Sequence, residues 1–284
     1  RQLADKFNTL QMGMVASERV FKVLDTDEHI PNDGKINKVK IEGLIDFENV
    51  SFAYNKEDFV LKDVSFTVKP GQSLALVGAT GAGKSSIINV LTRFYEYQKG
   101  SVKVDGVEIN QYQLEFLRKV SAVVLQDVFL FNDSVLNNIT LNNENIPFER
   151  VVEGAKLIGA HQFISELPGA YNYVVKERGV MLSSGQKQLL AFLRAYLYDP
   201  AILILDEATS SIDTTTELLI QNAISKITKG RSSIIIAHRL STIQNVDNII
   251  VMDQGKIAEQ GSHQELLKMN GIYKELYNHQ VSED

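Results

Sequence analysis

The stretch Gly78-Ala79-Thr80-Gly81-Ala82-Gly83-Lys84-Ser85 matches the pattern G-x-x-x-x-G-K-[ST]. It follows the apolar run Leu74-Ala75-Leu76-Val77 and precedes Ile87-Ile88-Asn89-Val90-Leu91, so a strand, a glycine loop and a helix are expected in succession. The glycines let several backbone N–H groups point at one anion, and the helix N-terminus adds about half a positive charge. Lys84 can reach β- and γ-phosphates, and the Ser85 hydroxyl can ligate Mg²⁺. The flanking strand and helix disfavour a mere turn with a solvated lysine, so we predict a nucleoside triphosphate site.

The composition of the chain limits the classes of function. Its 284 residues are 44% hydrophobic and 23% charged, which is ordinary for a globular protein. The net charge of -6 argues against a broad surface that binds nucleic acid. The chain contains no cysteine, which excludes disulfides and thiolate metal sites. No run approaches the roughly 18 apolar residues of a membrane span, and no signal peptide is visible, so we expect this chain to be soluble as given.

An amphipathic helix is expected at the N-terminus. Apolar residues recur there at helical steps: Leu3, Phe7, Leu10, Met14, Phe21 and Leu24. This helix either packs on its own domain or connects to a part that is absent. Because the chain begins with Arg1 rather than methionine, we expect a fragment of a longer protein. The charged stretch from Asp25 to Lys40 contains Pro31 and Gly34 and is typical of a linker.

The remaining chain alternates between strand and helix patterns. Strands are expected within 41–68, 100–110, 120–125, 201–205, 232–237 and 249–259. Helices are expected within 132–183, at 185–198 and 217–229, and as short pieces near 263–268 and 273–277. Strands and helices that alternate around a phosphate loop indicate an α/β fold with a largely parallel central sheet.

Two acidic residues end one of the apolar strands. The run from Ile202 to Asp206 delivers a carboxylate to the edge of the sheet, where it can help to hold Mg²⁺. Glu207 follows and, by strand alternation, should point elsewhere. One acid for the metal and one for a water molecule is what hydrolysis needs, although two acids can also simply end a strand.

The pentapeptide Leu182-Ser183-Ser184-Gly185-Gln186 resembles the L-S-G-G-Q signature of the nucleotide-binding domain of ATP-binding cassette (ABC) transporters. Alone, it would often be only a helix cap. It is accompanied, in the order that this family requires, by Tyr54, Gly78 to Ser85, Gln126, Asp206-Glu207, Ser210-Ser211-Ile212-Asp213 and His238. The resemblance implies a P-loop NTPase (RecA-like) core with an antiparallel β-subdomain and a helical subdomain at about 127–187. It places the ABC domain at 39–284.

The resemblance also implies a role for each matching residue. Tyr54 would stack on adenine, and Ser86 would contact the α-phosphate. Glu207 would be the general base, His238 would contact the γ-phosphate and orient Glu207, and Gln126 would touch Mg²⁺ and the attacking water. The remaining ATP-binding set is Gly78, Ala79, Thr80, Gly81, Ala82, Gly83, Lys84, Ser85, Ser183, Gly185, Gln186 and Asp213. The metal set is Ser85, Gln126 and Asp206.

In this family the signature serves a second domain. Ser183 and Gly185 would complete the ATP site of an opposing copy in a head-to-tail dimer, and Asp213 would reach across the interface. Ser184 replaces the first glycine of the family signature, for which we expect a mild effect. The segment Tyr173 to Gly179 keeps only the last three residues of the exporter pattern T-E-V-G-E-R-G. This difference suggests that the segment contacts its partner through different side chains.

Two further segments resemble the exporter subfamily. Phe129 to Val135 looks like the part that receives a coupling helix of the membrane domain, and Ala16 to Phe21 resembles the segment after the last membrane helix. Residues 1–38 would then be the cytoplasmic end of that helix plus a linker. We therefore expect the ATPase half of a half-transporter that works as a dimer at the cytoplasmic face of the inner membrane.

Alternative functions within the family are a non-transport ATPase of DNA repair or the ribosome, and a degenerate cassette that only binds ATP. The short segment between Gln126 and Leu182, the single cassette and the net acidity argue against the first. Glu207, His238 and the signature argue against the second. The transported substrate, and whether the partner chain is identical or different, stay open.

Overall fold

The computed structural model describes residues 2–27, 29–55, 58–176, 179–206, 214–237 and 240–283, except for the side chains of 214, 215, 240, 241 and 280–283. The chain divides into two compact units, Arg1–Pro31 and Asn32–Asp284. The first unit holds the predicted N-terminal helix, α1 (Gln2–Leu24), which has no buried side chain. Among the described residues, no helix combines the length and the hydropathy needed to cross a bilayer.

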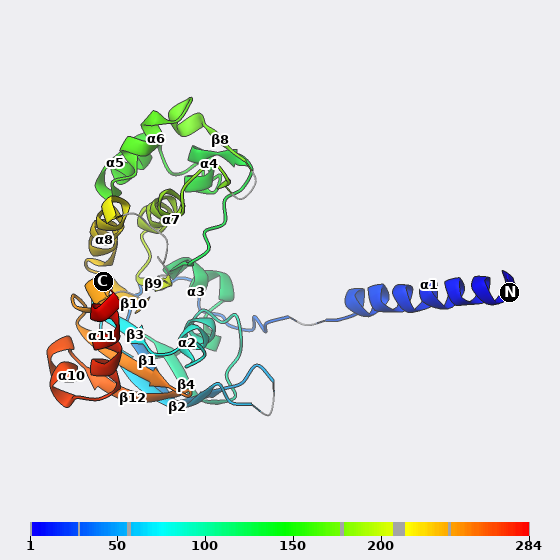
Figure 1. The fold of residues 1–284 in the computed structure, drawn as a ribbon, viewed down its shortest axis with the longest axis horizontal. Helices are drawn as coiled ribbons and strands as arrows, with labels where there is room; N and C mark the ends of the chain where they lie inside the picture. Colours follow the sequence, from blue (N-terminus) through cyan, green and yellow to red (C-terminus); the bar gives the residue numbers. More distant parts are fainter. Residues whose placement is uncertain are drawn as a thin grey trace. The chain divides into compact units, whose positions relative to one another are not determined.

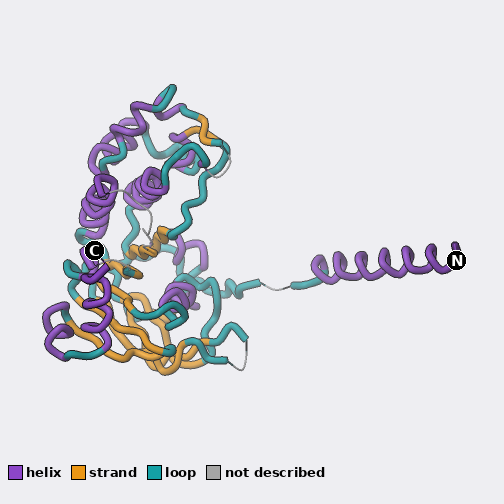
Figure 2. The backbone as a smooth tube through the Cα atoms, viewed as in Figure 1, coloured by secondary structure: helices purple, strands orange, loops and turns teal. Residues whose placement is uncertain are grey.

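A six-stranded sheet forms the centre of the second unit. Its strands are β12 (Lys256–Gly261), β11 (Asn248–Asp253), β3 (Ser73–Val77), β10 (Ser232–Ile236), β9 (Ile202–Asp206) and β6 (Ser121–Val124), in that spatial order. Figures 1 and 2 show most strands of this unit gathered at the end away from the helices within residues 135–166. All neighbouring pairs are parallel except the pair that β12 forms at the edge. The largely parallel sheet predicted from the sequence is therefore confirmed.

Both faces of this sheet are buried, which explains why its strands are continuous apolar runs. In β3, Leu74 and Leu76 belong to a core shared with the second large sheet and the helix α2 (Lys84–Leu91). Ala75 and Val77 alternate with them and belong to a core shared with the helices on the opposite face. Period-two alternation therefore divides one strand between two cores.

The second sheet is antiparallel, with the order β2 (Leu61–Val68), β1 (Ile45–Phe52), β4 (Lys99–Val104) and β5 (Val107–Glu108). Phe47 of β1 lies opposite Phe66 of β2, and their rings stack at 4.5 Å between centroids. A 3₁₀ turn, η1 (Ile109–Gln111), and helix α3 (Leu114–Val120) follow β5. The sequence pattern did not predict α3, and the strand expected from residue 120 begins at Ser121.

The helical lobe predicted between residues 132 and 183 is present at one end of the unit (Figure 1). Its elements are α4 (Val135–Thr140), α5 (Phe148–Ile158), α6 (His161–Glu166), η2 (Ala170–Asn172) and the long α7 (Ser184–Tyr198). A short pair that the sequence did not predict, β7 (Asp133–Ser134) with β8 (Val174–Val175), joins its ends. The later helices are α8 (Thr214–Thr228), α9 (Leu240–Ile243), α10 (His263–Met269) and α11 (Ile272–Glu283).

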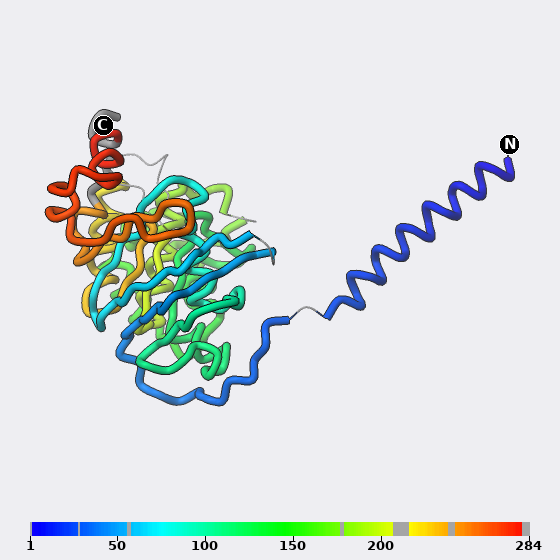
Figure 3. Tube along the Cα trace, turned by 90° about the horizontal axis from the view of Figure 1, so that it is seen from below, coloured from blue at the N-terminus to red at the C-terminus, as the bar shows by residue number. Residues whose placement is uncertain are grey.

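The segment that leads into β1 is attached to the domain instead of being a free tether. The Asn32 side-chain oxygen accepts from the Leu114 backbone N–H at 2.8 Å, at the first residue of α3. Ile36 forms a parallel bridge with Tyr112, and the Asp105 carboxylate accepts from the backbone N–H groups of residues 42–44 at 2.7–3.0 Å. Figure 3 shows this blue segment running along the domain before β1. The segment therefore has a defined path over the η1–α3 region.

Candidate active site

The strand order brings the candidate residues to one edge of the central sheet. Leu76 of β3 pairs with Ile236 of β10, Ile236 pairs with Asp206 of β9, and Leu205 pairs with Val124 of β6. Because these strands are parallel, the residues that follow them emerge at the same, carboxyl edge of the sheet, the usual place for a ligand in an α/β fold. The glycine loop, Asp206 and Gln126 all lie at this edge.

The glycine loop needs its glycines for two separate reasons. Gly78, Gly81 and Gly83 have φ angles of +144°, +83° and +106°, a region that residues with a Cβ rarely adopt. A Cβ on Gly78 would also lie 2.2 Å from the Met252 carbonyl oxygen of β11. Gly83 is the N-cap of α2, and its N-cap position provides no side-chain hydrogen bond to the helix. The N–H groups in the first turn of α2 can therefore donate to an anion.

Lys84 is held inside this loop. Its Nζ donates to the carbonyl oxygens of Gly78 at 2.7 Å and Ala79 at 3.0 Å, and the residue is only 7% exposed. Burial lowers the pKa of the Lys84 ammonium, and the nearby negative charge of Asp206 acts in the opposite direction. The structure therefore places a partly desolvated cation next to the acid that ends β9.

The residues predicted to hold Mg²⁺ fit the preference of that ion for oxygen ligands. Ser85 is exposed at the second position of α2, Asp206 is half-buried at the end of β9, and Gln126 is exposed after β6. They offer a hydroxyl, a carboxylate and an amide, and Mg²⁺ is usually bound by one or two carboxylates together with substrate phosphates. In the described part of the chain, no group of three or more His, Cys, Asp or Glu side chains could hold a metal ion. Phosphate oxygens would complete this site.

Tyr54 lies beside the start of α2. Its hydroxyl is 3.1 Å from the Ser86 hydroxyl, and the Asn89 side-chain amide donates to it at 2.8 Å. The Phe52 and Tyr95 rings contact its ring edge-on, with centroids 4.7 and 4.8 Å away, and the residue is 44% exposed. Sequence reasoning missed Asn89 and Tyr95, although Asn89 follows Ser86 at the three-residue step of one helical face.

The signature segment forms the start of α7. The Ser183 hydroxyl accepts from the Gln186 backbone N–H at 3.2 Å, and the Gln186 side-chain oxygen accepts from the Ser183 N–H at 3.0 Å. This capping box is the helix cap that the pentapeptide could form by itself. Gly185 is buried, whereas Ser183 is exposed. Since the Ser183 oxygen accepts in the cap, its own hydrogen remains able to donate to a further acceptor.

Three predicted residues, Glu207, Asp213 and His238, lie outside the described residues, as do Ser210, Ser211 and Ile212. Their predicted roles stay predictions.

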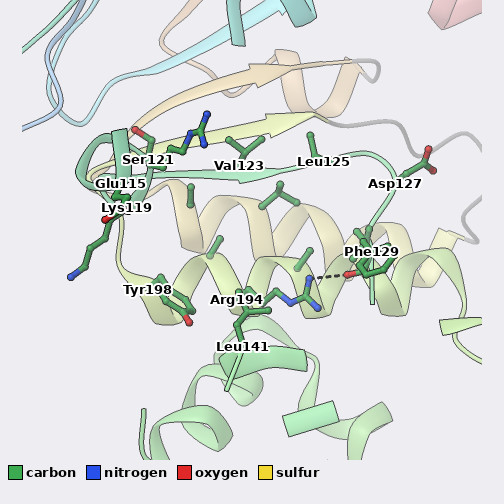
Figure 4. A pocket seen from close by; sticks show the side chains of 16 residues that line it. Glu115, Lys119, Ser121, Val123, Leu125, Asp127, Phe129, Leu141, Arg194 and Tyr198 are labelled. Carbon is green, nitrogen blue, oxygen red and sulfur yellow. Dashed lines mark hydrogen bonds between the residues drawn. The ribbon is translucent and has the colours of Figure 1, made fainter. Parts of the chain in front are cut away.

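A cavity of about 710 Å³ lies between β6, α3 and α7, next to Gln126. Figure 4 shows Ser121, Val123 and Leu125 on one side, with Arg194 and Tyr198 of α7 on the other. Leu125 and Phe129 are more than half exposed at its rim. We call this cavity the β6–α7 groove.

The position of Phe129 in this groove is maintained by Arg194. The Arg194 Nη1 donates to the Phe129 carbonyl oxygen at 3.0 Å (Figure 4). Its Nη2 donates to the Asn138 side-chain oxygen at 3.2 Å. Burial lowers the pKa of the Arg194 guanidinium. A docking role for Phe129 to Val135 is expected from the sequence, but no local pattern indicates Arg194, because its partners are 56 and 65 residues away.

Comparison with known proteins agrees with this geometry. Residues 61–210 match the family described as ABC transporter, which is more than half of the chain. The chain belongs to the ABC transporter family. The ATP-binding cassette resemblance and the P-loop NTPase fold class predicted from the sequence are thereby confirmed.

Similar proteins in this family include an ABC transporter ATP-binding protein and a lipid A-core flippase. The chain is 46% identical to the uncharacterized ABC transporter ATP-binding protein YknV of Bacillus subtilis, covering 99% of this chain and 47% of that protein. It is also 46% identical to the ATP-dependent lipid A-core flippase of Pseudomonas aeruginosa, covering 98% of this chain and 46% of the flippase. The chain thus spans about half the length of these relatives.

A solved structure extends the likeness to three dimensions. A bacterial Atm1-family ABC exporter with ATP bound matches with a TM-score of 0.85 and 37% identity, covering 96% of this chain and 48% of that one. The chain is thus an ATP-binding ATPase domain of the ABC transporter family, as predicted from its sequence, and its fold is similar to about half of this exporter chain.

Proposed function

We propose that two copies of this chain close head-to-tail around two Mg·ATP molecules and hydrolyse them, and that this cycle powers export by the longer protein of which the chain is a part. One observation supports the proposal most directly: the glycine loop, Asp206 and Gln126 meet at one sheet edge, whereas Ser183 caps a helix of the separate helical lobe. A site divided between sheet edge and lobe suits assembly from two copies.

Each residue then has a defined task. The N–H groups of the glycine loop and Lys84 bind the β- and γ-phosphates, Tyr54 stacks on adenine, and Ser183 with Gly185 of the opposing copy closes the site. Ser85, Gln126 and Asp206 would hold Mg²⁺, which neutralises phosphate charge when bound. Glu207 takes the proton from the attacking water, and His238 orients Glu207.

The β6–α7 groove is the proposed contact with the membrane domain. Its rim carries exposed apolar side chains, Leu125 and Phe129, and Phe131 contacts the Phe129 ring edge-on at 5.1 Å while itself 54% exposed. An apolar groove of this kind accommodates a short helix. Because Gln126 lies beside the groove, the position of a helix bound there can be coupled to the nucleotide site.

Residues 1–38 are proposed to be the cytoplasmic end of the last membrane helix and its linker. The apolar residues of α1, such as Leu3 and Leu24, support this assignment because they are exposed among the described residues of the first unit. The protein would then work at the cytoplasmic face of the membrane.

The solution mass of the variant Glu207→Gln, measured with and without Mg·ATP, tests this function. Loss of the general base should slow turnover by roughly 10²- to 10⁴-fold, so that ATP accumulates in the shared site and the mass doubles. Adding Lys84→Ala to this variant should abolish the doubling, because the ammonium that binds phosphate is lost. A variant that binds ATP yet stays monomeric would contradict a self-complementary dimer of this chain and would point to a different partner or to a need for the membrane domain.

A further inference from the structure

Tyr54 is joined to the phosphate-binding helix through its hydroxyl. The Asn89 side-chain NH2 group donates to this oxygen at 2.8 Å, and the Ser86 hydroxyl lies 3.1 Å from the same oxygen. Asn89 and Ser86 are on the same face of α2, the helix that begins with Lys84. Two polar groups of the helix that follows the glycine loop therefore hold the Tyr54 hydroxyl.

The donors and acceptors are compatible with one continuous series of hydrogen bonds. Because the Tyr54 oxygen accepts from Asn89, its own hydrogen is available for the Ser86 oxygen. The Ser86 hydroxyl hydrogen is then left for a different acceptor. In this arrangement each hydrogen bond of the series has one donor and one acceptor.

We propose that Asn89 is a positioning residue for nucleotide binding, which holds the Tyr54 ring in the orientation that stacks on the base. The proposal rests on the proposed function, in which Tyr54 receives adenine. Asn89 touches neither the base nor the phosphates in this account. It acts through the Tyr54 hydroxyl.

The surroundings of Tyr54 explain why such an anchor is needed. Phe52 and Tyr95 contact the ring at interplanar angles of 78° and 89°. The side chain is nevertheless 44% exposed, so packing covers only part of the ring. Fixing the free end of a half-exposed ring lowers the conformational entropy that is lost when a base stacks on it.

Calorimetric titration of the wild-type chain and of Asn89→Leu with ATP and with inorganic tripolyphosphate tests the proposal. Loss of one neutral hydrogen bond should weaken ATP binding by about fivefold. Tripolyphosphate has no base, so its affinity should stay within about twofold, which also shows that the phosphate loop of the variant is folded. In the Tyr54→Phe background, Asn89→Leu should cause no further loss, because its partner oxygen is already absent.

A matched control is Tyr97→Phe, which removes a different tyrosine hydroxyl that donates to Glu108 at 2.8 Å. This variant should bind ATP as the wild type does. An equal loss of ATP and tripolyphosphate affinity in Asn89→Leu would overturn the proposal, because Asn89 would then support the phosphate loop. An undiminished effect of Asn89→Leu in the Tyr54→Phe background would overturn it as well. Failure of the wild-type chain to bind ATP at all would instead overturn the proposed function.

Discussion

Single residues in the phosphate loop are constrained both by backbone conformation and by their neighbours. Gly78 has a φ of +144°, and a Cβ at this position would meet the Met252 carbonyl oxygen at 2.2 Å. Gly230 also has a positive φ, +76°, but a Cβ there would have no heavy atom within 4 Å. A side chain at Gly78 would therefore cause both backbone strain and a steric clash, whereas a side chain at Gly230 would cause backbone strain alone.

At this scale we predict that Gly78→Ala destabilises the domain by roughly 3–5 kcal/mol, because left-handed strain and a backbone clash add together. The control Gly230→Ala should cost only about 1–2 kcal/mol, from strain alone. The free energy of unfolding of the two variants, measured by urea denaturation, checks this difference. Equal losses in the two variants would show that the β11 backbone can yield at Gly78.

At the scale of secondary-structure elements, two helices begin with the same capping box. Ser183 and Gln186 cap α7, and Ser262 and Glu265 cap α10 in the same reciprocal way. Only the α7 cap is part of the proposed shared site. The two helices therefore allow the structural cost of losing a cap to be separated from the functional cost.

We predict that Ser183→Arg abolishes ATP hydrolysis while leaving ATP binding to the monomer unchanged, because the introduced side chain blocks the site of the opposing copy. Ser262→Arg should cost a similar cap energy, about 1 kcal/mol, and should leave hydrolysis intact. Phosphate release and nucleotide titration measure the two properties. A fall in monomer ATP affinity for Ser183→Arg would mean that the signature acts within its own chain.

At the scale of the second unit, two tyrosines in separate regions, the half-buried Tyr97 and the buried Tyr273, couple stability to pH. Burial and a hydrogen bond to Glu108 raise the pKa of Tyr97 to about 12 in the β-subdomain. Burial, and then the proximity of Tyr277, raise the pKa of Tyr273 to about 12 in α11. An ordinary tyrosine pKa is 10.0, so between these values the unfolded chain loses protons that the folded chain keeps.

The free energy of unfolding should consequently be unaffected by these groups below about pH 10 and should fall as the pH rises from about 10 to 12. Denaturation curves recorded across this range for the wild type, Tyr97→Phe and Tyr273→Phe check the prediction. Each variant should show a shallower fall with pH, and the double variant the shallowest. An unchanged slope in the double variant would assign the alkaline instability to other groups.

The sequence by itself determined the local features of this protein. The run Leu74 to Val77, the glycine loop and the start of α2 form as predicted, because each depends on neighbours a few residues apart. The end of α7 before Pro200 was predictable for the same reason, since proline cannot continue a helix. The linear order of the motifs also sufficed to identify the family.

Only the tertiary structure decided which distant segments meet. The strand order of the central sheet, the β7–β8 pair and the bonds of Arg194 join residues far apart in the chain. The contact of Asn89 with Tyr54 spans 35 residues in the same way. A residue pattern records helical and strand periods, whereas such contacts depend on how complete elements pack, so no local pattern specifies them.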